Sequence, residues 1–489
     1  MQRLFGFLVF VLFGCGLACG AEPAADASRA APPLPSRSER MQWWREARFG
    51  MFIHWGPVSL KGTEISWSRA NSNPKCPNKG PIPVEVYDNL YKEFNPVKFR
   101  GDEWVAIAGA AGMKYMVLTA KHCDGFALWH SQATDYNISQ TPFKRDVCGE
   151  LAAAAHKADM KIGWYFSPMD WRDPDFRTER NARYVASMQA QVRELLSNYG
   201  RIDLLWFDTD GGPALYDQAE TYRLVRTLQT QIIINNRLDM GSIHNYNAQI
   251  IEQNADYATP EQVVGGFDRT RPWETCMTLG TQWAWKPNDT IKSLKQCIDI
   301  LVRCAGGDGN LLLNVGPMPT GEIEPRQVQR LKEMGAWLKQ YGESIYGTRG
   351  GPWRPGPWGA ATCKGNTVYV HILQWPGDTI ALPALTKKIV SSKVLTGGTA
   401  SVKQTDGGVE ISVPATERQE IDTLVALELD GPAFDAGIFS GGASAARARF
   451  RARCTTTSTR SSTPSSSAAT NGSLSPAPPA PPGAASPRT

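Results

Sequence analysis

Short apolar runs alternate with longer amphipathic stretches between Met41 and Tyr346. Continuous apolar runs are typical of parallel strands buried on both faces, and the longer stretches repeat apolar residues at helical spacing. We expect strands at 49–55, 115–121, 161–166, 202–207, 231–236, 273–279 and 310–315, and a weaker one near 249–258. We expect helices at 180–198, 218–228, 291–304 and 326–341. Eight strands with intervening helices over about 300 residues predict an α/β fold, a (β/α)8 TIM-like barrel spanning 41–346.

The pattern changes after Tyr346. Short β-like runs separated by turns predict strands at 367–373, 379–382, 388–395, 400–404, 409–413 and 424–429. Runs of this length and spacing favour a small C-terminal β-sandwich over 347–435. Ser, Thr, Ala, Pro and Arg dominate the remainder, a composition that cannot bury a core, so we expect a disordered tail over 436–489.

The amino terminus has the pattern of an export signal. Arg3 precedes an apolar run and then small residues, which predicts a signal peptide over 1–21 and a linker over 22–40. Cys15 and Cys19 allow a lipid-anchored form, but their flanking residues do not favour it. No later segment approaches 18 consecutive apolar residues, so we expect an exported protein, periplasmic or extracellular, without stable membrane insertion.

Charge and cysteine content exclude several classes of function. Six arginines in 436–489 carry more than the whole formal charge of +5, which leaves −1 for the rest of the chain and no electrostatic footprint for nucleic acid. The eight cysteines beyond the leader show no Cys-x-x-Cys pair. One or two disulfides are plausible with partners left open, and no metal site or organic cofactor is expected. The sequence does not indicate an oligomeric state.

Several polar side chains stand at or near the ends of apolar runs. These are His54, His122, Tyr165, Asp208 and Arg237. Because the carboxyl ends of barrel strands form the active site, side chains from five strands are expected to converge there. Period-two alternation also places Asp208 on the same face as Trp206, a carboxylate beside an apolar platform.

Four blocks of sequence carry a resemblance to a known family. They are residues 49–56, 121–126, 206–208 and 310–317, in this order and at compatible spacing. Together they resemble the α-L-fucosidases of glycoside hydrolase family 29 over about 41–353. The resemblance implies a (β/α)8-like catalytic domain, often followed by a β-sandwich. It also implies removal of terminal α-L-fucose from glycans with retention of configuration.

The resemblance also implies roles for individual residues. Asp208 matches the nucleophile that forms a covalent fucosyl-enzyme. Side chains that match contacts to the sugar are His54, His122, Tyr165, Arg237, Trp283 and, more weakly, Trp67. Two glutamates compete for the acid/base role. We favour Glu261, which matches one branch of the family, and expect Glu274 to be a structural or ring-contact residue.

One departure from the family pattern leaves alternatives open. Family members commonly have two adjacent histidines where this chain has His122 and Cys123. The cysteine would either cost one hydroxyl contact, or point away and pair with another cysteine. Two other functions therefore stay open: a catalytically silent fucose-binding protein, and an exo-glycosidase for a fucose-like sugar such as L-galactose. The fucosyl linkage and the natural glycan are not readable from the sequence.

Overall fold

The computed structural model describes residues 35–70, 80–239 and 254–439. The predicted signal peptide, most of the linker and residues 440–489 of the predicted tail lie outside these ranges. Within them, no helix is long and apolar enough to cross a membrane.

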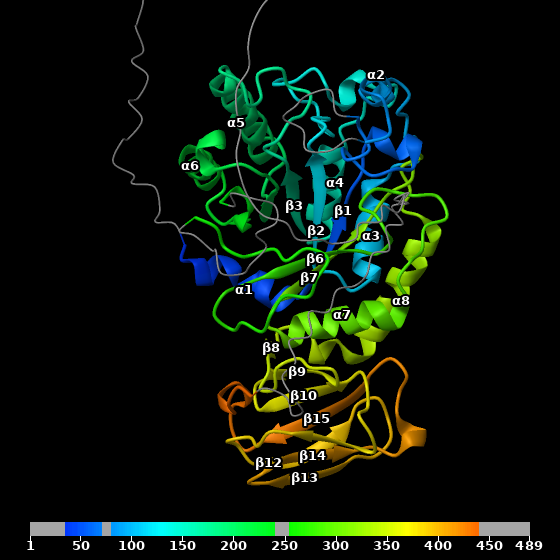
Figure 1. Cartoon of the computed structure of the whole chain (residues 1–489), viewed down its shortest axis with the longest axis vertical. Coiled ribbons are helices and arrows are strands. Elements are labelled where there is room, and N and C mark those ends of the chain that lie inside the picture. Colours follow the sequence, from blue (N-terminus) through cyan, green and yellow to red (C-terminus); the bar gives the residue numbers. More distant parts are fainter. Residues whose placement is uncertain (1–34, 71–79, 240–253, 440–489) are drawn as a thin grey trace, which may run out of the picture. The chain divides into compact units, whose positions relative to one another are not determined.

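A curled sheet of seven parallel strands forms the centre of the α/β part (Figure 1). The sheet order is β5-β4-β3-β2-β1-β7-β6. The strands are β1 (Phe49–Ile53), β2 (Tyr115–Lys121), β3 (Lys161–Phe166), β4 (Leu204–Phe207), β5 (Ile233–Ile234), β6 (Glu274–Thr278) and β7 (Asn310–Val315). Almost every residue in them is buried, as their apolar runs predict, and β2, β3 and β7 have the predicted bounds.

The described part of the expected eighth strand, residues 254–258, does not form a regular strand. Residues 249–253 of that prediction lie outside the described residues. The chain that follows makes single parallel bridges: Tyr257 to Asn235 after β5, Ala258 to Trp273, and Glu261 to Cys276 on β6. The segment 257–261 therefore lies between β5 and β6 and contacts both.

Helices α3 to α8 follow strands and cover the outer side of the sheet, whereas α1 precedes β1 and its buried side chains pack with the inner face (Figure 1). The helices are α1 (Arg37–Ala47), α2 (Val84–Tyr87), α3 (Gly101–Ala110), α4 (Val147–Lys157), α5 (Asn181–Ser197), α6 (Gln218–Leu228), α7 (Leu294–Gly306) and α8 (Pro325–Tyr341). Ser293 caps α7 in a reciprocal capping box with Gln296. Asp289, in the loop before α7, accepts the Thr281 backbone N–H at 2.8 Å.

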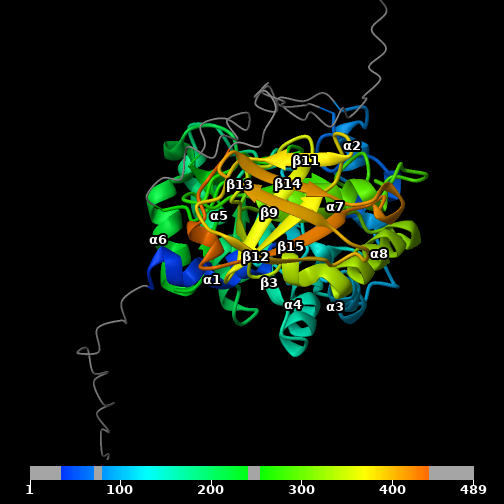
Figure 2. The ribbon, with the colours of Figure 1, turned by 90° about the horizontal axis from the view of Figure 1, so that it is seen from below.

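Two antiparallel sheets follow α8 and face the viewer in Figure 2. One has the order β12-β15-β10-β9-β8 and the other β11-β14-β13. Their strands are β8 (Arg349–Gly350), β9 (Gly359–Lys364), β10 (Thr367–Ile372), β11 (Thr379–Leu382), β12 (Ile389–Val394), β13 (Ser401–Thr405), β14 (Gly408–Ser412) and β15 (Thr423–Leu429). Side chains from both sheets, among them Val370, Ile411 and Val425, share one buried apolar cluster.

The inner face of the parallel sheet has its own apolar cluster. Along β1, Met51 and Ile53 belong to the cluster shared with the helices, whereas Phe52 belongs to the inner cluster with Tyr165 and Trp206. This alternation is the period of two of a β-strand. A polar residue that follows a strand at the next inward-facing position therefore lies just beyond these aromatic side chains, at the carboxyl end of the sheet.

Candidate active site

Asp208 follows β4 in the register of Trp206 and is held by two donors. The Tyr165 hydroxyl on β3 donates to its Oδ2 at 2.9 Å, and Arg237 Nη1 donates to its Oδ1 at 2.8 Å. Burial raises the pKa of Tyr165 well above 10, so its hydroxyl remains a donor. The Asp208 side chain is 20% exposed, which leaves it accessible to a substrate.

Arg237 joins Asp208 to a second carboxylate. It lies in the short 3₁₀ helix η5 (Asn236–Leu238) after β5, and its other terminal nitrogen donates to Glu261 Oε2 at 2.8 Å. Its Nε donates to Thr259 Oγ1 at 2.8 Å, and the guanidinium lies 4.4 Å above the Trp206 ring. The guanidinium is therefore fixed on several sides and holds both carboxylates on one rigid, planar group.

Two histidines stand beside this pair. His54 follows β1, His122 follows β2, and their ring centroids are 5.7 Å apart. The His122 ring stacks on Tyr165 at 5.2 Å with an interplanar angle of 3°. Burial lowers the pKa of His122 to about 4, against the opposing charge of Asp208. Burial, and then His122, lower the pKa of His54 well below 6.5, so both imidazoles are neutral near pH 7.

Trp283, in the loop after β6, forms an aromatic wall next to His54. The two ring centroids are 4.7 Å apart. Glu64, in the loop after β1, accepts the Trp283 backbone N–H at 2.8 Å, and Asn314 Nδ2 donates to the Trp283 carbonyl at 2.7 Å. Burial raises the pKa of Glu64 to about 7, and the charge of Glu261 adds to the shift. The Trp283 backbone is thus held by the loop after β1 and by β7.

Trp67 is half-buried in the same loop as Glu64. Its ring makes an edge contact with Trp171, which follows β3, at a centroid distance of 5.1 Å. The preceding residue, Ser66, has its hydroxyl oxygen 2.6 Å from His122 Nδ1.

Glu274 does not join this group. It begins β6 at the amino end of the sheet and is 0% exposed. Its carboxyl group accepts from the indoles of Trp44 at 3.2 Å and Trp206 at 3.3 Å, and from the Tyr115 hydroxyl. Burial raises its pKa to about 7. Of the two roles expected for Glu274, structural or ring contact, these contacts support the structural one, because protein donors surround its carboxyl group.

Cys123 is buried, with 1% of its surface exposed. Its Sγ lies 3.3 Å from Ser167 Oγ, which donates to the Asp208 backbone carbonyl at 3.2 Å. The described cysteines, Cys123, Cys148, Cys276, Cys297, Cys304 and Cys363, are all free. The expected disulfides are therefore absent among these six. No group of three potential metal ligands occurs among the described residues.

Three residues of the site were not predicted: Glu64, Ser66 and Asn314. Asn314 ends the apolar part of β7, so the rule that selected Asp208 also points to it. Glu64 and Ser66 lie in an irregular loop, where no sequence periodicity marks them.

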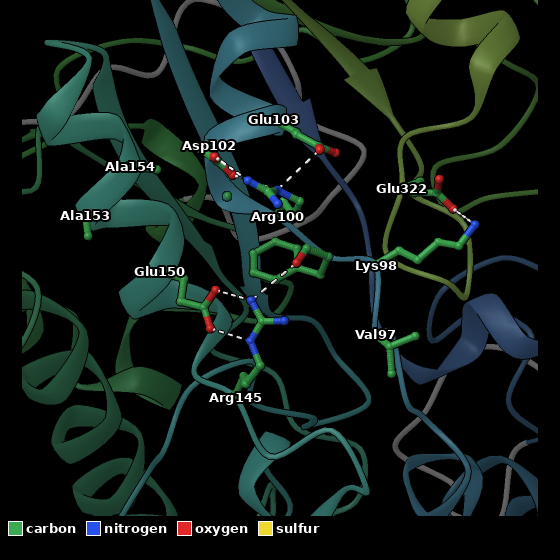
Figure 3. Close-up of a pocket in the computed structure, with 12 residues that line it drawn as sticks. Val97, Lys98, Arg100, Asp102, Glu103, Arg145, Glu150, Ala153, Ala154 and Glu322 are labelled. Atoms are coloured by element: carbon green, nitrogen blue, oxygen red, sulfur yellow. Dashed lines mark hydrogen bonds and ion pairs between the residues drawn. The ribbon is translucent and has the colours of Figure 1, made fainter.

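A groove of about 720 Å³ lies apart from these residues (Figure 3). Residues 97–103 line one part of the groove. Its charged side chains pair with one another, such as Arg145 with Glu150 and Lys98 with Glu322. None of the candidate site residues lines it, and its paired charges leave no evident group for a ligand.

Comparison with known proteins identifies the class. The sequence pattern that defines the α-L-fucosidase family matches residues 18–343. Human plasma α-L-fucosidase is 30% identical over 388 residues, which cover 72% of this chain and 81% of that protein. The chain belongs to the α-L-fucosidase family and is a glycoside hydrolase.

Solved structures agree with this identification. Isoenzyme 1 of the α-L-fucosidase from Paenibacillus thiaminolyticus matches with a TM-score of 0.72 and 34% identity, over 81% of this chain and 99% of that one. A family 29 α-L-fucosidase from Bacteroides thetaiotaomicron, solved as a trapped covalent intermediate, has the same fold at a TM-score of 0.70 and 24% identity, over 82% and 98% of the two chains.

Proposed function

We propose that Asp208 is the nucleophile and Glu261 the acid/base of a retaining exo-α-L-fucosidase. The observation that carries this assignment is the shared guanidinium: Asp208 and Glu261 each accept a 2.8 Å hydrogen bond from Arg237. Retaining glycosidases need two carboxyl groups only about 5–5.5 Å apart, and one planar fork brings two groups into close range. The Bacteroides relative, described as a covalent intermediate, supports a double displacement.

The chemistry then follows from the contacts. An Asp208 oxygen attacks the anomeric carbon while the bond from that carbon to the glycosidic oxygen breaks. Glu261 gives its proton to the glycosidic oxygen, which departs with the leaving group. Arg237 stabilises the carboxylate that Glu261 becomes. Glu261 next takes a proton from water, which attacks the same carbon and releases Asp208. Tyr165 and Arg237 hold the nucleophile in position by donating to its two carboxylate oxygens.

The sugar is bound by the groups around this pair. His54 and His122 contact hydroxyl groups, with Tyr165 and Arg237 beside the ring. Trp283 packs against the methyl group, and Trp67 borders the same pocket. Glu64 is a structural group, because backbone N–H groups of Ile65, Trp283 and Ala284 already occupy its carboxylate oxygens.

The domain organisation is part of the proposal. Residues 41–346 form the catalytic domain, whose eight-stranded barrel is completed by the bridged segment 257–261. Residues 347–435 form a β-sandwich over the shared apolar cluster. The protein is exported and acts on fucosylated oligosaccharides or glycoconjugates, and relatives named for plasma support export.

Two experiments test the assignment. Proton NMR of an aryl α-L-fucoside digest should show α-L-fucose as the first product; β-L-fucose first would contradict retention. In Glu261→Ala, turnover of natural fucosides should fall far more than that of an aryl fucoside with a good leaving group, and azide should give α-L-fucosyl azide. Glu64→Gln, the matched carboxyl variant, should give no azide product. A silent fucose-binding protein would show none of this chemistry.

A further inference from the structure

The hydrogen bond between His54 and Asn314 fixes where the proton of His54 lies. Asn314 Nδ2 faces the Trp283 carbonyl at 2.7 Å, and a carbonyl only accepts, so the Asn314 amide cannot be flipped. Its Oδ1 therefore faces His54 Nδ1 at 2.6 Å. An amide oxygen also only accepts, so Nδ1 carries the proton of the neutral ring. His54 Nε2 is left as an acceptor.

A different network of hydrogen bonds fixes His122. Ser66 Oγ lies 2.6 Å from His122 Nδ1 and accepts the Asp124 backbone N–H at 2.9 Å. The Tyr87 hydroxyl accepts the Ser66 N–H at 2.7 Å and donates to Asp124 Oδ2 at 2.7 Å. The described residues offer the Ser66 hydroxyl proton no acceptor other than His122 Nδ1. Ser66 therefore donates to Nδ1, and the His122 proton lies on Nε2.

We propose that Asn314 and Ser66 are positioning residues that hold His54 and His122 in opposite tautomers. His54 presents Nε2 as an acceptor and His122 presents Nε2–H as a donor to the bound sugar. The inference rests on the proposed function, in which these two histidines contact the hydroxyl groups of fucose.

Opposite tautomers favour a ligand group that can both donate and accept a hydrogen bond. A hydroxyl group satisfies the pair, because it can donate to His54 and accept from His122, either alone or as two neighbouring hydroxyls. A fluorine or methoxy group in its place has no proton to donate and leaves His54 Nε2 unpaired. The low pKa of His122, about 4, supports the argument because a doubly protonated ring would have two donors.

The backbone at Ser66 allows a sharp variant. Ser66 has φ = 56°, in the left-handed region that glycine adopts without strain. Ser66→Gly therefore removes the hydroxyl while keeping the backbone conformation. Ser59→Ala is the matched control, because Ser59 is a buried serine that donates to the Gly56 carbonyl and contacts neither histidine.

The test is long-range proton–nitrogen NMR of protein labelled with ¹⁵N-histidine. The chain has only six histidines, and loss of signals in His54→Asn and His122→Asn assigns the two of interest. We expect a protonated Nδ1 in His54 and a protonated Nε2 in His122. In Ser66→Gly, His122 should become a mixture of tautomers while His54 keeps its pattern, and kcat/KM should fall about 5- to 10-fold, as for one lost hydrogen bond. Ser59→Ala should change neither.

The same tautomer in both rings would overturn the inference, and so would a His122 pattern unchanged by Ser66→Gly. Fucosidase activity is measured on the same samples. Opposite tautomers without turnover would overturn the proposed function and leave the tautomer assignment standing. Turnover with identical tautomers would overturn the tautomer assignment and leave the proposed function standing.

Discussion

Asp208 and Glu261 come from different parts of the chain, yet each accepts a hydrogen bond of 2.8 Å from a terminal nitrogen of the same guanidinium, that of Arg237. Asp208 follows β4, whereas Glu261 lies in the bridged segment before β6. Arg237 itself is nearly inaccessible and stacks on Trp206. The relative position of the two carboxylates therefore depends on one buried, tightly packed side chain.

Arg237→Lys should reduce kcat/KM by about 100-fold or more. Lysine keeps the positive charge but cannot donate to two carboxylates from one planar group. Turnover of an aryl fucoside measures the loss. Arg226→Lys is the matched control, since Arg226 pairs with the buried Asp256 outside the site. Equal losses in the two variants would mean that Arg237 contributes only to packing.

Glu274→Gln should destabilise the fold without affecting substrate binding. Two indole N–H groups and the Tyr115 hydroxyl donate to the carboxyl group of Glu274, and an amide offers them only one oxygen. We expect the free energy of unfolding to fall by about 1–3 kcal/mol and KM to stay within about twofold. Denaturant unfolding and kinetics on one preparation check both. A large rise in KM with unchanged stability would contradict this and would instead indicate that Glu274 contacts the sugar.

The buried His122 should make stability depend on acidity. Its pKa is about 4 in the folded protein, against 6.5 for an unperturbed histidine. Between these values the unfolded chain binds a proton that the folded protein does not. The free energy of unfolding should therefore fall as pH falls from 6.5 to 4, by up to about 3 kcal/mol. Unfolding of His122→Asn at several pH values should show a weaker dependence than unfolding of the unchanged protein, and an equal dependence would contradict the role of His122.

Cys123→His should not supply a second sugar-binding histidine. The thiol faces Ser167 in a packed interior, so an imidazole there would overpack the region that supports the Asp208 backbone. We expect a loss of about 1–3 kcal/mol in stability and no gain in kcat/KM. Cys123→Ser, which preserves size, is the comparison. Higher activity at unchanged stability in the histidine variant would show that position 123 faces the substrate.

The sequence predicts those parts of the fold that local periodicity determines. The buried runs at β2, β3 and β7 are continuous, so their bounds match, and alternation places Asp208 above Trp206. β9 was not predicted, because its alanines and glycine carry little strand signal. The sequence left two roles open for Glu274, structural or ring contact, and its place at the start of β6 supports the structural one, because only the carboxyl end of the strand faces the site.

Contacts between distant loops could not be predicted in the same way. Glu64, Ser66 and the bridged Glu261 lie in irregular backbone, where no period relates sequence position to direction. The resemblance to the family supplied Glu261, but only the structure places it on Arg237. It also places Asn314 and Ser66 against the two histidines.

The most direct test of the account is the product that Asp208→Ala forms from an aryl α-L-fucoside in the presence of azide. A matched melting temperature shows that the variant is folded. Without its nucleophile the enzyme should lose nearly all turnover, and azide should enter the vacated space and displace the leaving group once, giving β-L-fucosyl azide. Undiminished hydrolysis without azide, or an azide product of the α configuration, would contradict the assignment of Asp208.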